Sequence, residues 1–87
     1  MKTLEHYANE INIPVRSIQG KTRKQEIATA REVYWRYLNN RGVRMTDIAA
    51  MFNRNAHSTI SSGIRRAENL ISCNDEIILP FLKAVEP

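Results

Sequence analysis

The 87-residue sequence has few residues that interrupt or cross-link a chain: three glycines, three prolines and one cysteine. A lone Cys73 excludes a disulfide within the chain and is typical of a reducing compartment, so we expect a cytoplasmic protein. The longest apolar runs, such as residues 77–79, are too short to cross a membrane. The N-terminus, MKTLEHYANE, is polar and carries Glu5 and Glu10, which argues against a signal peptide.

Residues that could form a catalytic or metal centre are also scarce. His6, His57 and Cys73 lie far apart and lack the paired spacing of a zinc site, so we predict no bound metal. Nothing in the sequence activates Cys73 as a nucleophile, and we expect it to be half-buried near a helix end. The sequence therefore predicts neither an enzyme nor a cofactor.

Basic residues, in contrast, are plentiful and unevenly placed. The net charge is +4, and the sequence pI is about 9.6. Between Arg16 and Arg66 lie eleven of the 13 Lys and Arg residues but only three acidic residues, whereas the two ends together carry a net −4. A basic middle with acidic flanks is typical of a surface that binds a polyanion such as nucleic acid. An ordinary basic surface is the alternative.

Apolar spacing predicts helices along most of the chain and no strand. The clearest pattern covers residues 25–39, where apolar side chains recur at helical spacing. Pro80 lies inside the last expected helix, so we expect a kink or a late start there. The other expected helices cover residues 2–11, 14–18, about 46–52, 57–72 and 75–85.

The order of these helices indicates a helix-turn-helix. A long helix is followed by a short one, by the turn NRNA and by a further helix, so the motif covers about residues 45–72. We expect Trp35 and Met51 in the core. Many small helical domains also contain such a pair of helices. The fold class predicted is therefore all-α, with about six helices in a single domain over residues 1–87.

The GKT of residues 20–22 is also how a P-loop ends. A P-loop needs another glycine five residues earlier, where this chain has Val15, and it follows a strand rather than the short helix expected here. We therefore predict that this chain binds no nucleotide. Residues 20–24 are instead a basic loop, suited to DNA phosphates or to a minor groove. A solvated loop is the alternative.

A second polar cluster, NRNAHSTISSGIRR, occupies residues 53–66. Polar side chains share one face of the expected helix at positions i, i+3, i+4 and i+7, namely Ser58, Ser61, Ser62 and Arg65. Small hydroxyls near a helix N-terminus can approach a groove closely and reach base edges. The alternative is a solvent-facing helix with His57 as a local cap. Gly63 either permits close helix packing or is incidental.

These residues resemble a known family. The segment RKQEIATAREVYWRYLNNRGVRMTDIAAMFNRNAHSTISSGIRRAENLI is similar to the C-terminal DNA-binding domain (domain IV) of DnaA, the bacterial replication initiator. The preceding LEHYANEINIPVRSIQG resembles that family's linker helix and the short helix after it. The strongest single motif is the HST of residues 57–59, followed by the basic pair at residues 65–66.

The resemblance implies a helix-turn-helix whose second helix enters the major groove of a short asymmetric DNA box. By position, His57, Ser58 and Thr59 would contact bases or base methyl groups. Arg23 aligns with the arginine that reads the adjacent minor groove, and Arg31 with one that contacts phosphate. With the charge pattern, the predicted DNA-binding residues are Lys21, Arg23, Lys24, Arg31, Arg54, Asn55, His57, Ser58, Thr59, Ser62 and Arg65.

The sequence also departs from the family pattern. Ala56 stands where the family has an aspartate that accepts a hydrogen bond from a cytosine amino group, so we expect a different DNA box. Asn53 and Arg54 replace glycines, and Arg54 and Asn55 could supply other contacts. The family's ATPase module is not in these 87 residues. The chain is then either a fragment or, if Met1 is native, a protein that acts by binding alone.

Three functions remain open from the sequence. The first is sequence-specific binding of double-stranded DNA, resembling the origin-box-binding domain of DnaA. The second is a stand-alone regulator on a mobile element or prophage. The third is a protein-interaction module that retains the fold. DNA binding requires the basic loop and the tip of the recognition helix to lie on the same side of the molecule.

Overall fold

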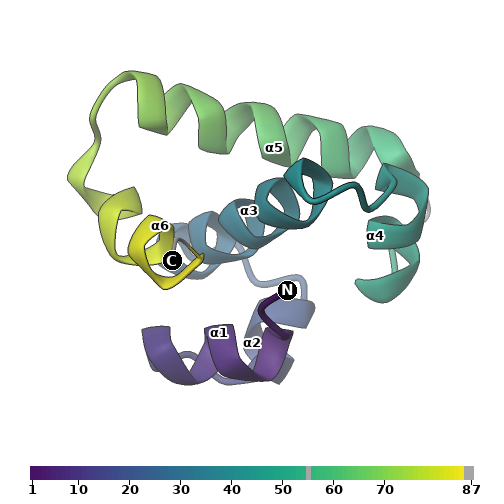
Figure 1. Cartoon of the computed structure of the whole chain (residues 1–87), viewed down its shortest axis with the longest axis horizontal. Coiled ribbons are helices and arrows are strands. Elements are labelled where there is room, and N and C mark those ends of the chain that lie inside the picture. Colours follow the sequence, from purple (N-terminus) through teal and green to yellow (C-terminus); the bar gives the residue numbers. More distant parts are fainter. Residues whose placement is uncertain (55, 86–87) are drawn as a thin grey trace.

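The computed structural model describes residues 1–54 and 56–85. In Figure 1, α3 runs through the middle of the molecule, with α5 across one side and α1 and α2 on the other. The all-α class predicted from the sequence is confirmed, and the described residues include no strand. The elements are α1 (Leu4–Ile11), α2 (Val15–Gln19), α3 (Gln25–Asn40), α4 (Met45–Met51), α5 (His57–Ser72), the 3-10 turn η1 (Glu76–Ile78) and α6 (Leu79–Val85).

The ends of α1 to α5 agree with the sequence prediction to within one or two residues. The Thr3 hydroxyl accepts a hydrogen bond from the His6 N–H and so caps α1. Pro14 lies one residue before α2 rather than inside it. The expected late start near Pro80 is confirmed, because η1 precedes α6 and Pro80 falls in the first turn of α6.

Asparagine occupies most of the left-handed turn positions, which explains why the chain needs few glycines. Asn12, Asn53 and Asn74 have φ angles of 58°, 54° and 54°, and Gly42 has 96°. Asparagine tolerates this region better than other side chains do. Asn53 therefore permits the turn between α4 and α5 at a position where the family pattern has glycine.

The core is built around α3, which is buried on more than the one face that its apolar stripe predicts. Thr29, Arg31 and Glu32 are buried along with the stripe, because α5 packs on one side of α3 and α2 and α6 on others. Trp35 is buried, as expected. The buried apolar residues of α3 are Ala30, Val33, Tyr34, Trp35, Tyr37 and Leu38.

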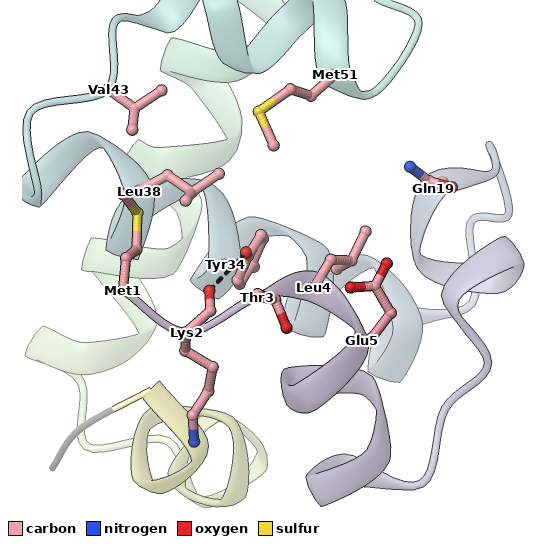
Figure 2. Close-up of a pocket in the computed structure, with 10 residues that line it drawn as sticks. All are labelled: Met1, Lys2, Thr3, Leu4, Glu5, Gln19, Tyr34, Leu38, Val43 and Met51. Carbon is pink, nitrogen blue, oxygen red and sulfur yellow. Dashed lines mark hydrogen bonds between the residues drawn. The ribbon is translucent and has the colours of Figure 1, made fainter.

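Two expectations about burial are wrong. Met51, expected in the core, is 46% exposed. It lines a shallow groove with residues of the N-terminal segment, shown in Figure 2. Cys73, expected to be half-buried, is exposed at the C-terminal end of α5. Both residues lie at helix ends, where helical periodicity gives little information about burial.

Tyrosine side chains attach the N-terminal segment to α3. The Tyr34 hydroxyl donates to the Lys2 carbonyl oxygen at 2.9 Å (Figure 2), and the Lys2 N–H donates to the Tyr37 hydroxyl at 2.6 Å. The buried Tyr7 hydroxyl donates to the Ala30 carbonyl at 2.6 Å. Burial raises the pKa of Tyr34 to about 12, with Tyr37 and Glu5 adding to the shift. The hydroxyl groups of these three tyrosines therefore stabilise the fold by binding backbone groups of the N-terminal segment and of α3.

Candidate nucleic-acid interface

The helix-turn-helix predicted from the sequence consists of α4, the turn after it and α5. Ile48, Ala49 and Phe52 point inward, as expected, and all are buried. Phe52 meets Trp35 edge to face, with ring centroids 5.6 Å apart and an interplanar angle of 83°. These contacts hold α4 and the start of the turn against α3.

The inner face of α5 packs closely on α3. Ile60, Gly63, Ile64 and Ala67 are buried on this face. A β-carbon at Gly63 would lie 2.6 Å from the Cε3 and Cζ3 atoms of Trp35, closer than real contacts allow. Of the two interpretations of Gly63, close helix packing is therefore confirmed.

The outer face and the tip of α5 are exposed. His57, Ser58 and Thr59 form the first turn of the helix, and Ser62 and Arg65 continue the exposed side along it. Exposure of these side chains is what a groove-binding helix requires.

The N-terminus of α5 is left without a capping side chain. Ala56 is the N-cap residue, in extended backbone with φ −138° and ψ 139°, and it makes no side-chain cap. The first N–H groups of a helix lack the usual helical partner, so side chains, water, a tighter turn bond or a ligand satisfies them. The Thr59 N–H makes such a turn bond to the Ala56 carbonyl at 3.2 Å. Backbone donors and the positive end of the helix dipole at this tip are suited to a phosphate group.

The basic loop, residues 20–24, lies between α2 and α3. Lys21, Arg23 and Lys24 are exposed, whereas Thr22 is partly buried. The Thr22 hydroxyl accepts a hydrogen bond from the Lys24 N–H at 3.4 Å, which closes the loop on itself. Gly20 ends α2 as predicted, in extended rather than left-handed backbone, with φ −73°. Three cationic side chains therefore project from a short ordered loop.

Arg31 does not project toward solvent as its predicted phosphate contact requires. Its side chain lies under the basic loop, and the residue is only 6% exposed. The Nε atom donates to the Ile18 carbonyl at 2.6 Å, and Nη2 donates to the carbonyls of Ser17 at 3.4 Å and Thr22 at 3.3 Å. The structure thus corrects this prediction, because these hydrogen bonds use Arg31 to hold the loop against α3.

Arg54 is likewise occupied within the protein. Its Nη2 donates to the Gly20 carbonyl at 2.8 Å, and its Nη1 donates to the carbonyls of Phe52 at 2.6 Å and Gln19 at 3.4 Å. The guanidinium also lies over the Trp35 ring, 5.8 Å from its centroid. Three hydrogen bonds thus join Arg54 to backbone carbonyls while the residue stays partly exposed, and its DNA contact remains a prediction.

Arg31 and Arg54, which we call the arginine pair, lie close enough for Arg54 to lower the pKa of Arg31. Burial lowers the pKa of Arg31, and the positive charge of Arg54 lowers it further, while Glu32 opposes the shift. Burial also lowers the pKa of Arg54. Two like charges are tolerated here because they meet the carbonyl end of α2, where the helix dipole is negative.

The two arginines near the middle of α5 have different environments. Arg66 reaches Glu32 of α3, with its Nε and Nη2 atoms 2.8 Å and 2.7 Å from Oε2. Glu32 has only 9% of its side chain exposed, so this ion pair satisfies a nearly buried carboxylate. Arg65 points outward and is exposed. The two residues of the basic pair therefore differ, because Arg66 pairs with Glu32 while 60% of its side chain stays exposed, and Arg65 points away from this ion pair.

The arginine pair brings the basic loop and the helix-turn-helix together. Arg54 belongs to the turn before α5, and its bonds to the carbonyls of Gln19 and Gly20 reach the start of the loop. Asn55, also predicted to contact DNA, lies outside the described residues. The predicted DNA-binding residues that are exposed are Lys21, Arg23, Lys24, His57, Ser58, Thr59, Ser62 and Arg65.

Other kinds of site find little support in the residues described. Within residues 1–54 and 56–85, no group of three His, Cys, Asp or Glu side chains could hold a metal ion. Across the same residues, every helix is too short or too polar to cross a bilayer.

Comparisons with known proteins point to one family. The family model described as the bacterial dnaA protein helix-turn-helix matches residues 2–67, a range that contains every predicted DNA-binding residue. One relative, the chromosomal replication initiator protein DnaA of Ureaplasma parvum serovar 3, is 32% identical over 69 residues. The match covers 78% of this chain but only 15% of that relative's length. No solved structure matches the chain.

Proposed function

Because the chain belongs to the bacterial DnaA helix-turn-helix family, we propose that it binds double-stranded DNA and reads a specific short sequence. The observation that carries this proposal is the junction at Arg54. Hydrogen bonds from Arg54 to Gln19 and Gly20 join the turn before α5 to the start of the basic loop, and Arg23 of this loop lines a cavity with Arg66 and Asn69 of α5. A cationic loop next to an exposed helix is suited to two neighbouring grooves of one duplex.

In this proposal α5 enters the major groove by its N-terminal end. His57, Ser58 and Thr59 are the first residues of the helix and are exposed, so they are the side chains that would meet base edges. The uncapped N–H groups after Ala56 would face a backbone phosphate. Ser62 and Arg65 would continue the contact along the groove.

The basic loop would contact the same duplex one groove away. Arg23 is the side chain that we assign to the minor groove, where a guanidinium gains from the strong negative potential. Lys21 and Lys24 flank it, are exposed, and would neutralise phosphates. The loop therefore contributes both affinity and a second point of reading.

We further propose that the sequence read is not the usual family box. Ala56 has no acceptor for a cytosine amino group, which removes the contact that the resemblance assigns to an aspartate. The relative's name ties it to chromosomal replication initiation, and we propose origin binding as the role of this domain. Selection of binding sites from random duplex DNA would identify the box.

Salt dependence tests whether duplex DNA is the ligand. With about five or six phosphate contacts, a plot of log affinity against log salt concentration should have a slope near −5. Fluorescence anisotropy of a labelled random duplex measures this directly. Absence of binding at low salt would refute the proposal and favour an interaction module with the same fold.

Replacing Arg23 tests the role of the basic loop. We expect Arg23→Ala to lower affinity about tenfold and to relax base preference at one edge of the selected site, because the minor-groove contact is lost. Lys83→Ala is the matched control, since Lys83 is an exposed cation in α6. Equal losses for the two variants would mean that the loop acts only through overall charge.

A further inference from the structure

We propose that Arg54 is a positioning residue for DNA reading. It fixes the basic loop against the turn of the helix-turn-helix, so that the loop and the tip of α5 engage one duplex in a set register. This inference rests on the proposed function, and it assigns to Arg54 a role other than contact with DNA.

The hydrogen bonds of Arg54 reach both sides of the junction. Nη1 donates to Phe52 in its own turn at 2.6 Å, which fixes the guanidinium relative to α4. Nη2 donates to the Gly20 carbonyl at 2.8 Å, and a longer bond of 3.4 Å runs from Nη1 to Gln19. One planar group therefore connects segments that are 34 and 35 residues apart in sequence.

Arg54 is also the main polar connection between these segments. Among the hydrogen bonds between the described residues, those that join residues 19–24 to the segment 52–54 and 56–59 all come from this one side chain. Arg31 holds the loop to α3 through Ser17, Ile18 and Thr22, but it makes no such bond to the turn. The two arginines thus have separate tasks.

The shape of the guanidinium suits this task better than charge alone does. Arginine presents several donors in a rigid plane, so one side chain can meet three carbonyls in different directions and stack on Trp35 at the same time. Lysine carries the same charge at a single point and cannot reproduce this fork. Without Arg54, the carbonyl groups of Gln19 and Gly20 at the end of α2 would lack these side-chain donors.

A double-mutant cycle between Arg54 and Arg23 tests the proposal. Arg54→Gln keeps a hydrogen-bonding side chain but removes the fork and the charge, so the loop loses its link to the turn. We expect affinity for the selected duplex to fall about tenfold in this variant. Adding Arg23→Ala should then lower affinity less than about twofold, against about tenfold in the unmodified chain, because a displaced loop no longer places Arg23 in the groove.

Two further variants separate position from charge. Arg41→Gln removes one charge from an exposed arginine that lies over Tyr37, and Arg23→Ala should keep its full effect in that background. Arg54→Lys keeps the charge and should still weaken the effect of Arg23→Ala. This variant also replaces Arg54→Gln in the cycle if circular dichroism shows that Arg54→Gln does not fold.

The outcomes distinguish this inference from the proposed function. If Arg23→Ala lowers DNA affinity equally with and without a substitution at Arg54, the positioning role is overturned, while DNA binding itself stands. A full effect of Arg23→Ala in the Arg54→Lys background would also overturn it, since charge would then suffice. Failure of the unmodified chain to bind any duplex would instead refute the proposed function.

Discussion

The two faces of α5 differ in role, because one packs in the core and the other is exposed to solvent. On the inner face, Ile60, Gly63 and Ala67 are buried against the core, and a β-carbon at Gly63 would lie 2.6 Å from the Trp35 ring. On the outer face, Ser58 and Ser62 are exposed, small and polar. Serine is a poor helix former. The outer face therefore depends on the packing of the inner face for its helical shape.

Because the two faces of α5 differ in burial, substitutions on the two faces should have different effects on stability and on DNA binding. Inner-face substitutions should change the free energy of unfolding and affect DNA binding only through the folded fraction. Outer-face substitutions should change DNA affinity and leave stability nearly constant, since exposed side chains contribute little to folding. Substitutions at neighbouring positions of the helix can test this separation.

The largest effect is expected at Gly63. Gly63→Val should lower the free energy of unfolding by up to about 3 kcal/mol, because the new side chain overlaps the buried Trp35 ring. Urea unfolding followed by circular dichroism measures the change. Ser62→Val is the control, one residue away on the exposed side, and should shift stability by less than about 0.5 kcal/mol. Similar losses for both would break the distinction between the two faces.

Arg65 and Arg66, which are adjacent in α5, provide a sharper test of the difference between its two faces. Arg66→Ala should cost about 1–2 kcal/mol of stability, because it leaves the nearly buried Glu32 carboxylate without its partner. The figure is below that of a fully buried pair, since 60% of the Arg66 side chain is exposed. Thermal unfolding of the variant measures it.

Arg65→Ala is the matched comparison for Arg66→Ala. It should leave the melting temperature almost unchanged, reduce DNA affinity and make the salt slope less steep by about 1. Both variants lose one arginine from consecutive positions, so their net charge is identical. A larger loss of stability in Arg65→Ala than in Arg66→Ala would contradict the assignment of the two faces.

The smallest effect is expected at the tip of the helix. Ala56→Asp should raise the free energy of unfolding by about 1 kcal/mol, because an aspartate at the N-cap can accept from the first N–H groups of α5. It should also shift base preference toward cytosine at one position of the selected site. Site selection with both proteins checks the second effect, and an unchanged consensus would exclude residue 56 from base reading.

Much of the fold follows from local patterns in the sequence. Apolar spacing predicts α3 and α5 nearly to the residue, and Pro80 marks the start of α6. The exceptions are Met51 and Cys73, which are exposed although we expected Met51 in the core and Cys73 half-buried. Each lies at the end of a helix, where burial depends on whether another element reaches that far.

The candidate site was predicted less evenly. The exposure of the tip of α5 could be predicted, because the apolar residues of that helix lie on its other side. The exposure of Lys21, Arg23 and Lys24 could also be predicted, because no apolar residue lies among them. The sequence does not distinguish Arg31 and Arg54 from Arg23, because all three are arginines in a basic region. The ion pair between Arg66 and Glu32 was also missed, since its partners are 34 residues apart.

The sequence by itself determined the helices, the apolar side of each, and the concentration of positive charge in the middle of the chain. These properties depend on residues within a few positions of one another. Only the tertiary structure decided which arginines face solvent. The carbonyls that bind Arg31 and Arg54 lie mainly at the end of α2, and folding alone brings them within hydrogen-bonding distance of α3 and of the turn before α5.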